Sequence, residues 1–300
     1  MKIGNGLKGH TALFIARLFS GLNINALKYL LPLWIAPLSC VTLRLLFGLL
    51  LFWTIGIFEK PDTSSISDRV KLFFIGAVAV FGYMSLYAVG LSMTTPVNLA
   101  ILNSMQPIWV FILSAIFLGE KVTGNKIIGI LVGFIGAILC LLSQPEKGLA
   151  TNPLLGNILG LSCSVCYAVY IILSGKILRR VSNMTMLRYT FLGASVSSLI
   201  MTFVVGFDAP LFSLHVNAKA IVAFVYILLF PTVLSYLLIP IGLKYLNATA
   251  VSIYGYMTLF VATVASVMLG QDKLDDIQLS ALAMMCLSIY WVSVAESSSE

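Results

Sequence analysis

Long apolar runs recur along the whole chain, and short polar connections separate them. A helix that crosses about 30 Å of hydrocarbon must satisfy its backbone hydrogen bonds internally, so roughly 20 apolar residues mark one membrane span. None of the connections is long enough to hold a soluble domain. The pattern therefore predicts ten transmembrane helices, at about 11–32, 36–58, 70–94, 96–119, 126–143, 153–178, 183–205, 218–246, 249–271 and 274–293.

The composition agrees with this pattern. Of the 300 residues, 60% are hydrophobic and only 10% are charged, whereas a soluble domain has about 25% charged residues. The first apolar run carries Arg17 and lacks a small-x-small cleavage site, so we expect a span there rather than a secretory signal. The sequence predicts an all-α, polytopic membrane protein of the cytoplasmic (inner) membrane, with the lipid bilayer as its surroundings.

The lysines and arginines between the spans predict the orientation of the chain. If the N-terminus is inside, twelve of them fall on the inner side and three, Lys147, Lys219 and Lys273, fall on the outer side. Basic residues concentrate on the cytoplasmic side of membrane proteins, so both termini are expected in the cytoplasm. The same bias explains the net charge of +7, and we predict no nucleic-acid partner.

The two halves of the chain resemble each other. Residues 103–123 align without gaps on residues 254–274, with matches of Val110 to Val261, Leu118 to Leu269 and Gly119 to Gly270. Because five is an odd number of spans, a second set of five enters the membrane from the opposite side. We therefore predict a 5+5 inverted-topology repeat, 1–143 and 144–300, with a substrate site near the midplane between the halves.

The span that begins TTPVNLAILNSMQPIWVFILSAIFLGEKVT and the next one, with GILVGFIGAIL, resemble the EamA-type branch of the drug/metabolite transporter superfamily. The sharpest local element is Pro107 in mid-span, followed by Leu-Gly-Glu at the exit, which ends at Glu120. The second half departs from this pattern, because Thr258 and Gln271 stand at the corresponding positions. The resemblance implies transport, and the superfamily carries amino acids, sugars, nucleotide derivatives and drugs.

Polar residues concentrate in the fourth span. Asn98, Asn103 and Gln106 lie on one broad face of a continuous helix, and Pro107 removes a backbone donor near Asn103. Side-chain amides in hydrocarbon are costly unless they are paired. Two interpretations remain open, since the amides could either make hydrogen bonds between helices or line a wet cavity that binds a substrate.

Other spans offer residues that could line the same cavity. They are Asn23, Tyr83, Tyr87, Trp109, Tyr236, Tyr254 and Thr258. Pro231 is expected to bend the eighth span and, with Pro107, to act as a hinge. Glu120, beside Lys121, is interpreted either as part of an inner gate or helix-end ion pair, or as a solvated charge.

Arg44 is the deepest charge predicted in the membrane. It lies about eight residues into the second span, roughly 12 Å deep, so snorkelling alone does not bring it to water. Its partner could be a backbone carbonyl, a helix C-terminus, water, or a carboxylate or phosphate of the substrate. By contrast, all eleven acidic residues fall in loops or at span ends, which disfavours proton antiport through a buried carboxylate.

The predicted function is alternating-access export of a small polar organic metabolite, an amino acid or related compound, down its gradient. Alternatives are a proton-coupled drug/metabolite antiporter and a non-transporting receptor or scaffold. An enzyme is disfavoured because no nucleophile with its base, and no metal motif such as HExxH, occurs at membrane depth. Cys163 and Cys166 lie on a span without a nearby histidine, so we predict no metal and no cofactor. We expect a monomer or weak dimer.

Overall fold

The computed structural model describes residues 3–31, 33–59, 64–118, 124–142, 150–213, 217–246 and 254–297. Its elements are α1 (Ile3–Leu30), α2 (Pro37–Ile57), α3 (Ile66–Ile75), η1 (Gly76–Val80), α4 (Phe81–Met93), α5 (Pro96–Asn103), α6 (Gln106–Leu118), α7 (Gly124–Leu142), α8 (Pro153–Leu178), α9 (Asn183–Val205), η2 (Pro210–Phe212), α10 (Ala218–Ile227), η3 (Leu228–Leu234), α11 (Ser235–Tyr245), α13 (Gly255–Met268) and α14 (Asp276–Ser297). In these ranges the structure is helical and contains no β-sheet.

Six helical segments are long and apolar enough to cross a membrane. They are Pro37–Ile57, Ile66–Met93, Pro96–Phe117, Pro153–Leu178, Asn183–Val205 and Ala218–Tyr245, and shorter apolar helices occur at Ile127–Leu139, Met257–Met268 and Asp276–Ser288. The prediction of an all-α, multi-pass membrane protein is therefore confirmed, whereas the number of ten spans stays a prediction. The first helix begins at Ile3, earlier than the hydrophobic pattern indicated.

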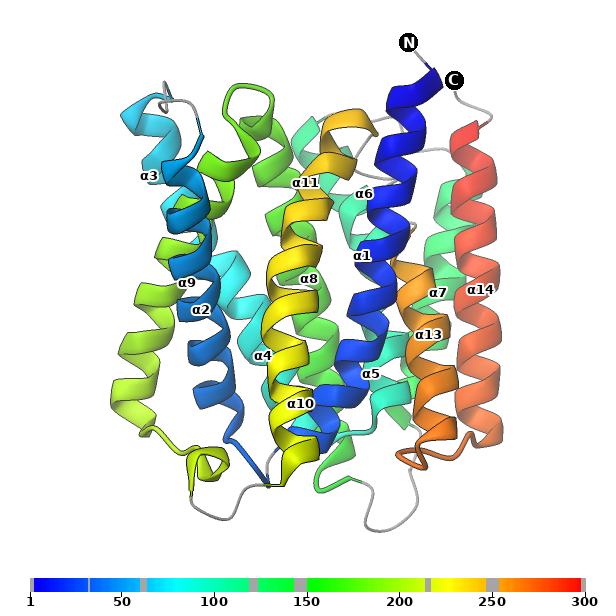
Figure 1. Cartoon of the computed structure of the whole chain (residues 1–300). Coiled ribbons are helices and arrows are strands. Elements are labelled where there is room, and N and C mark those ends of the chain that lie inside the picture. The colour runs from blue at the N-terminus through cyan, green and yellow to red at the C-terminus, as the bar shows by residue number, and fades with distance from the viewer. Residues whose placement is uncertain are drawn as a thin grey trace.

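The helices form one bundle with their axes roughly along a common direction (Figure 1). The most extensive contacts join α2, α3 and η1 to α9, α7 to α14, α4 and α6 to α8, and α1 to α11 and α13. Each of these pairs contains one helix from residues 1–143 and one from residues 144–300. The start of α1 and the end of α14 lie at the same end of the bundle (Figure 1).

Three of the spanning segments are not regular α-helices. Residues 66–93 contain the π-helix η1, and residues 218–245 contain the π-helix η3 with Pro231 inside it. The segment 96–118 breaks after Asn103, and α6 begins at Gln106. Pro107 is the second residue of α6, where its missing N–H leaves no helical hydrogen bond unmade. The continuous helix expected for the fourth span is therefore wrong, because the chain divides it into two short helices.

Glycines allow the helices to approach closely where they cross. A Cβ at Gly156 of α8 would lie 2.8 Å from the backbone oxygen of Gly90 in α4. At a second crossing, a Cβ at Gly193 of α9 would meet the backbone of Phe73 and Ala77. Small residues at such crossings permit the close packing that holds helices together in lipid.

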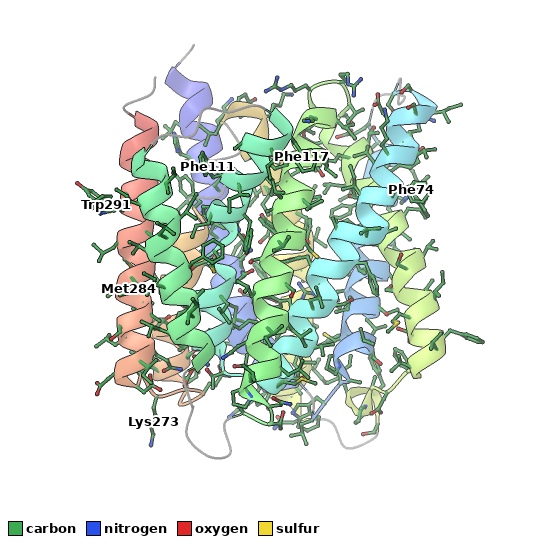
Figure 2. All side chains as sticks on the ribbon, turned by 180° about the vertical axis from the view of Figure 1, so that it is seen from behind. Phe74, Phe111, Phe117, Lys273, Met284 and Trp291 are labelled. Atoms are coloured by element: carbon green, nitrogen blue, oxygen red, sulfur yellow. The ribbon has the colours of Figure 1, made fainter. Side chains whose placement is uncertain are left out.

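Apolar side chains cover the outside of the bundle. Phe203 of α9 is 92% exposed and Phe74 of α3 is 60% exposed. Figure 2 shows Phe74 and Trp291 pointing away from the bundle, while Lys273 extends from the end opposite the start of α1. An apolar belt of this kind faces hydrocarbon in a membrane protein.

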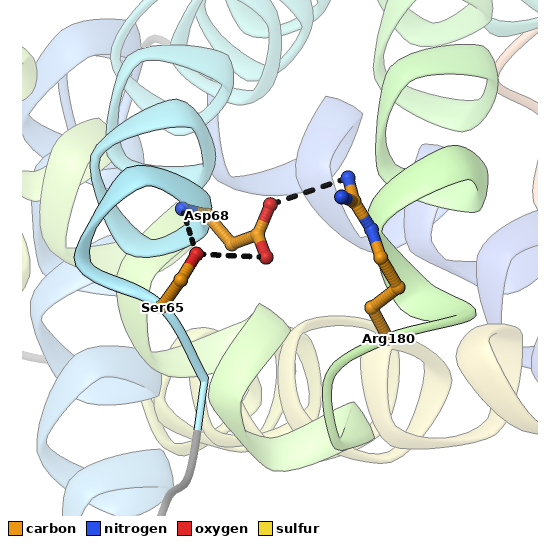
Figure 3. A network of polar contacts seen from close by, with 3 residues as sticks. All are labelled: Ser65, Asp68 and Arg180. Carbon is orange, nitrogen blue, oxygen red and sulfur yellow. Dashed lines mark hydrogen bonds and ion pairs between the residues drawn. The ribbon is translucent and has the colours of Figure 1, made fainter.

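A capping network fixes the start of α3 (Figure 3). The backbone N–H of Asp68 donates to Ser65 Oγ at 3.1 Å, and the Ser65 hydroxyl donates to Asp68 Oδ2 at 3.0 Å. Arg180 Nη2 lies 3.3 Å from Asp68 Oδ1, and its side chain is 61% exposed. Ser65 therefore caps the helix, and the ion pair between the exposed Arg180 side chain and the largely buried Asp68 carboxylate ties it to the connection between α8 and α9.

We expect Ser65→Ala to lower the free energy of unfolding by about 1 kcal/mol, because it removes the helix cap. Arg180→Ala should cost at most about 0.5 kcal/mol, because water and salt screen an ion pair with so exposed a partner. Unfolding of both variants in detergent gives the comparison. A larger loss in Arg180→Ala than in Ser65→Ala would contradict this assignment.

Candidate functional site

A polar cavity lies inside the bundle, with a volume of about 40 Å³. Helices from both parts of the chain contribute to it. The lining residues are Arg17, Ser20, Asn23, Arg44, Tyr83, Met84, Tyr87, Asn103, Tyr167, Pro231, Ser235, Tyr236, Ile239 and Thr258. This volume is room for about three water molecules, so the structure has a narrow, polar centre rather than an open substrate pocket.

Most of the candidate binding residues predicted from the sequence meet at this cavity. Asn23 of α1, Arg44 of α2, Tyr83 and Tyr87 of α4, Asn103 of α5, Tyr236 of α11 and Thr258 of α13 all line it, and so does the candidate hinge Pro231. Asn103 is the last residue of α5 and lies directly before the fourth-span break. Gln106, the first residue of α6, donates from Nε2 to Asn103 Oδ1 at 2.6 Å, so it supports the lining residue without lining the cavity itself.

Three other candidates lie in helix contacts away from the cavity. Asn98 accepts a 2.8 Å hydrogen bond from Gln278 of α14 at its Oδ1. Trp109 packs edge-on against Phe134 of α7, with ring centroids 5.4 Å apart. Tyr254 makes a 2.8 Å hydrogen bond with His10 through its hydroxyl. The candidate gate Glu120 lies outside the described residues.

Arg44 has a neutral partner. Its Nε donates to Thr232 Oγ1 at 2.8 Å, and the Thr232 hydroxyl donates to the backbone oxygen of Ile227 at 2.7 Å. Pro231 lacks the N–H that would bond the Ile227 carbonyl in a regular α-helix. In the π-helix η3 the Thr232 hydroxyl donates to this carbonyl, and the same hydroxyl holds the Arg44 guanidinium at the cavity.

Several lining residues were not predicted from the sequence, namely Ser20, Met84, Tyr167, Ser235 and Ile239, and Arg17 was noted only as a positive charge within the first span. Arg17 Nη2 donates to the Tyr167 hydroxyl at 3.1 Å, and its guanidinium lies 5.5 Å from the centre of that ring. Tyr167 also contacts Tyr83, with ring centroids 5.0 Å apart. The spacing of Tyr167 and Tyr170 on one helix face is the sequence signal that could have found this side of the cavity.

Near the end of the bundle opposite the start of α1, a buried polar cluster joins both parts of the chain. Lys28 Nζ donates to the backbone oxygens of Leu91 at 3.2 Å and Thr94 at 2.6 Å. Asp272 Oδ2 accepts from the backbone N–H of Val97 at 3.2 Å, at the start of α5. Lys28 also interacts electrostatically with Asp272. The cluster therefore connects α1 and Asp272 to the junction between α4 and α5.

The described residues at the other end of the bundle surround a hollow. A hollow of about 490 Å³ lies between the ends of α8 and α11, lined by Gly175, Leu178, Arg179, Leu243, Lys244, Tyr245 and Leu246. Both helices end on the side where α1 begins (Figure 1). In the described residues the two ends of the bundle thus differ, one carrying this polar cluster and the other the hollow.

Because of Asp272, we expect the stability of the folded protein to depend on pH. Burial raises the pKa of its carboxyl above the usual 3.8, against hydrogen bonds from Thr95, Val97, Lys273 and Gln278 that lower it. Between the usual and the raised pKa the folded protein keeps a proton that the unfolded chain has lost. The stability from this group is therefore fully present below the usual pKa and is lost as the pH rises through the raised value.

We expect Asp272→Asn to remove this contribution. As the pH rises above the usual carboxyl pKa of 3.8, the melting temperature of the wild-type protein in detergent should fall more steeply than that of Asp272→Asn. The variant keeps an oxygen that can accept from the Val97 N–H, so its fold is retained. If the melting temperatures of the two proteins change in parallel with pH, the pH dependence does not come from Asp272.

Comparisons with known proteins agree with this architecture. Residues 7–142 and 154–294 each match the model of the EamA-like transporter family. The chain is 26% identical over 261 residues to the uncharacterized transporter YyaM of Bacillus subtilis (strain 168), covering 84% of this chain and 83% of that protein. It is 28% identical to an uncharacterized transporter of Archaeoglobus fulgidus, over 60% of this chain and 66% of the relative. A protein of known crystal structure has the same fold, with a TM-score of 0.66 at 18% identity, over 98% of this chain and 99% of the other.

Proposed function

Because the chain belongs to the EamA-like transporter family, a family of membrane transporters, we propose that it exports a small polar organic metabolite, an amino acid or related compound, by alternating access. The cavity carries this proposal, since it is the place where polar side chains from both halves of the chain face a common space. Secondary transporters commonly bind substrate at such an interface near mid-membrane.

The helix pairings support the inverted repeat that this mechanism needs. If each helix of residues 1–143 is exchanged with its counterpart in residues 144–300, the α4–α8 contact becomes the α1–α11 contact, and α6–α8 becomes α1–α13. The α2–α9 and α7–α14 pairs exchange into themselves. Separate matches of residues 7–142 and 154–294 to one family model are also what two related halves would give.

The proposed motion widens the cavity toward one end and then toward the other. A volume of about 40 Å³ is too small for an amino acid, so the closed state must open before a substrate enters. The break between α5 and α6 and the π-helix around Pro231 border the cavity. Irregular segments of this kind can absorb the backbone changes of a hinge.

The lining favours movement down a gradient over proton antiport. In the part of the chain that the structure describes, the cavity wall contains no Asp, Glu or His, the groups that usually carry protons at membrane depth. The positive-inside bias supports a cytoplasmic-membrane location with both termini inside. The cluster around Lys28 and Asp272 would then close the outer end.

Flux in proteoliposomes tests the proposal. Purified protein should move a subset of radiolabelled amino acids, at rates that do not depend on an imposed pH gradient. Asn103→Ala should lower the flux, whereas Tyr254→Phe, outside the cavity, should leave it unchanged. Absence of flux for every amino acid and related metabolite would overturn the proposed function, and a strict requirement for a pH gradient would favour the proton-coupled alternative.

A further inference from the structure

The cavity wall has a net positive charge. Arg17 and Arg44 both line it, and their side chains are only 4% and 5% exposed. No carboxylate belongs to the lining in the described ranges. From this charge pattern we infer that the substrate is an organic anion of net negative charge, whose carboxylate or phosphate group lies against Arg17 and Arg44. This inference rests on the proposed function and specifies its substrate class.

The reason is the cost of burying charge. A buried cation in a membrane protein is expensive unless an opposite charge or several hydrogen-bond acceptors compensate it. The acceptor that Arg44 meets is the neutral hydroxyl of Thr232, and two guanidinium groups at one cavity repel each other. An anion relieves both costs, whereas a cation would add a third positive charge.

The geometry of the wall suits a carboxylate or phosphate. A guanidinium group offers paired N–H donors that match the two oxygens of such a group. Tyr83, Tyr87 and Tyr167 line the cavity together with the two arginines, and a tyrosine hydroxyl can donate to an anion. A substrate ammonium group has no carboxylate to meet at this wall, so a zwitterion gains less from the site than a molecule that is negatively charged overall.

The side-chain oxygen of Asn23 is a further hydrogen-bond acceptor beside the cavity. Asn23 lines the cavity and its side chain makes a hydrogen bond with Tyr87, whereas its Oδ1 is buried and has no hydrogen-bond partner in the described part of the protein. A buried polar atom without a partner costs free energy, and a hydroxyl or N–H group on the substrate would satisfy it. The site therefore fits an anion that also carries a hydrogen-bond donor, as acidic amino acids, hydroxy acids and sugar phosphates do.

A matched series of solutes separates charge from shape. We suggest malate, glutamate, glycerol 3-phosphate, glutamine, glycerol and putrescine as radiolabelled probes, in proteoliposomes with a membrane potential set by potassium and valinomycin. The anions should be transported, and their flux should rise when the potential pulls negative charge in the direction of movement. The carboxylate and phosphate probes distinguish the two kinds of anionic group.

Variants of Arg44 test whether the preference for anions comes from the positive charge of this residue at the cavity. Arg44→Gln should lower anion flux about tenfold or more, because it removes charge-assisted hydrogen bonds, and Arg44→Lys should retain part of the flux and its dependence on potential. Arg188→Gln is the matched control, because Arg188 contacts the Phe52 backbone oxygen and the Trp53 ring outside the lining. If Arg44→Gln does not fold, the dependence of wild-type flux on the membrane potential still tests whether the transported solute is an anion.

The outcomes are distinguishable. Transport of glutamine or glycerol but not of the anions, or flux that ignores the membrane potential, would overturn the inference and leave the proposed function intact. Transport of no probe by folded protein would overturn the inference, and the proposed function would be overturned as well only if the full series of amino acids and related metabolites also gave no flux. Anion flux that is equal in Arg44→Gln and in the wild type would also overturn the assignment to this cavity.

Discussion

Gly193→Ala is expected to lower the free energy of unfolding by about 3 kcal/mol. The added Cβ would meet the backbone oxygen and carbon of Phe73 and the backbone nitrogen of Ala77, where α9 crosses α3 and η1. These are main-chain atoms, so no side-chain rotation can make room, and the two helices must move apart. Overpacking of this kind costs about 1–3 kcal/mol, and occasionally more, and a rigid backbone neighbour belongs to the upper end of that range.

Gly175→Ala is the matched control. An added Cβ at Gly175 of α8 meets nothing within 4 Å, and alanine is the better helix former by about 1 kcal/mol. Unfolding of both variants in detergent, followed by circular dichroism, should therefore show a large loss for Gly193→Ala and no loss for Gly175→Ala. Equal stability of the two variants would contradict the close helix crossing.

Thr232→Val should lower substrate transport, because it removes the hydroxyl that positions Arg44. The Thr232 side chain does not itself line the cavity. The substitution keeps the shape but removes the hydroxyl that accepts from Arg44 Nε and donates to the Ile227 carbonyl. A buried charged donor without its acceptor costs about 1.5–3 kcal/mol. We expect a loss of stability of that size, together with a reduced rate of substrate flux.

Thr232→Ser provides the control for this effect. Serine keeps the hydroxyl and loses only a methyl group, so both hydrogen bonds remain and most of the flux should be retained. The measurement is the flux of each variant in proteoliposomes beside its melting temperature in detergent. If Thr232→Val and Thr232→Ser behave alike, the hydroxyl does not position Arg44.

The membrane fold could be predicted because hydrophobicity in a bilayer follows a simple length rule. The surroundings of a single residue could be predicted where they depend on the nearby sequence. Arg44 was expected to need a partner at its depth, and Pro231 was expected to disturb its helix. Their connection through Thr232 could not be foreseen, since it depends on the register between α2 and η3, which are far apart in sequence.

The fourth span shows the opposite case. Asn98, Asn103 and Gln106 were expected on one face because a continuous helix was assumed. The break after Asn103 gives each side chain a different surrounding: Asn98 pairs with Gln278, Asn103 lines the cavity, and Gln106 holds Asn103. Such breaks depend on tertiary contacts as well as on local sequence, because the neighbouring helices must satisfy the freed backbone groups.

The central claim is that the cavity opens alternately to both sides of the membrane. It is tested most directly with Ser235→Cys, a nearly isosteric change at a lining residue, in a variant whose native cysteines are replaced by serine or alanine. Lys273→Cys, at one end of the bundle (Figure 2), marks the sidedness of the vesicles. A membrane-impermeant thiol reagent should label position 235 from both sides and position 273 from one side only. Labelling of position 235 from a single side, or from neither, would contradict alternating access.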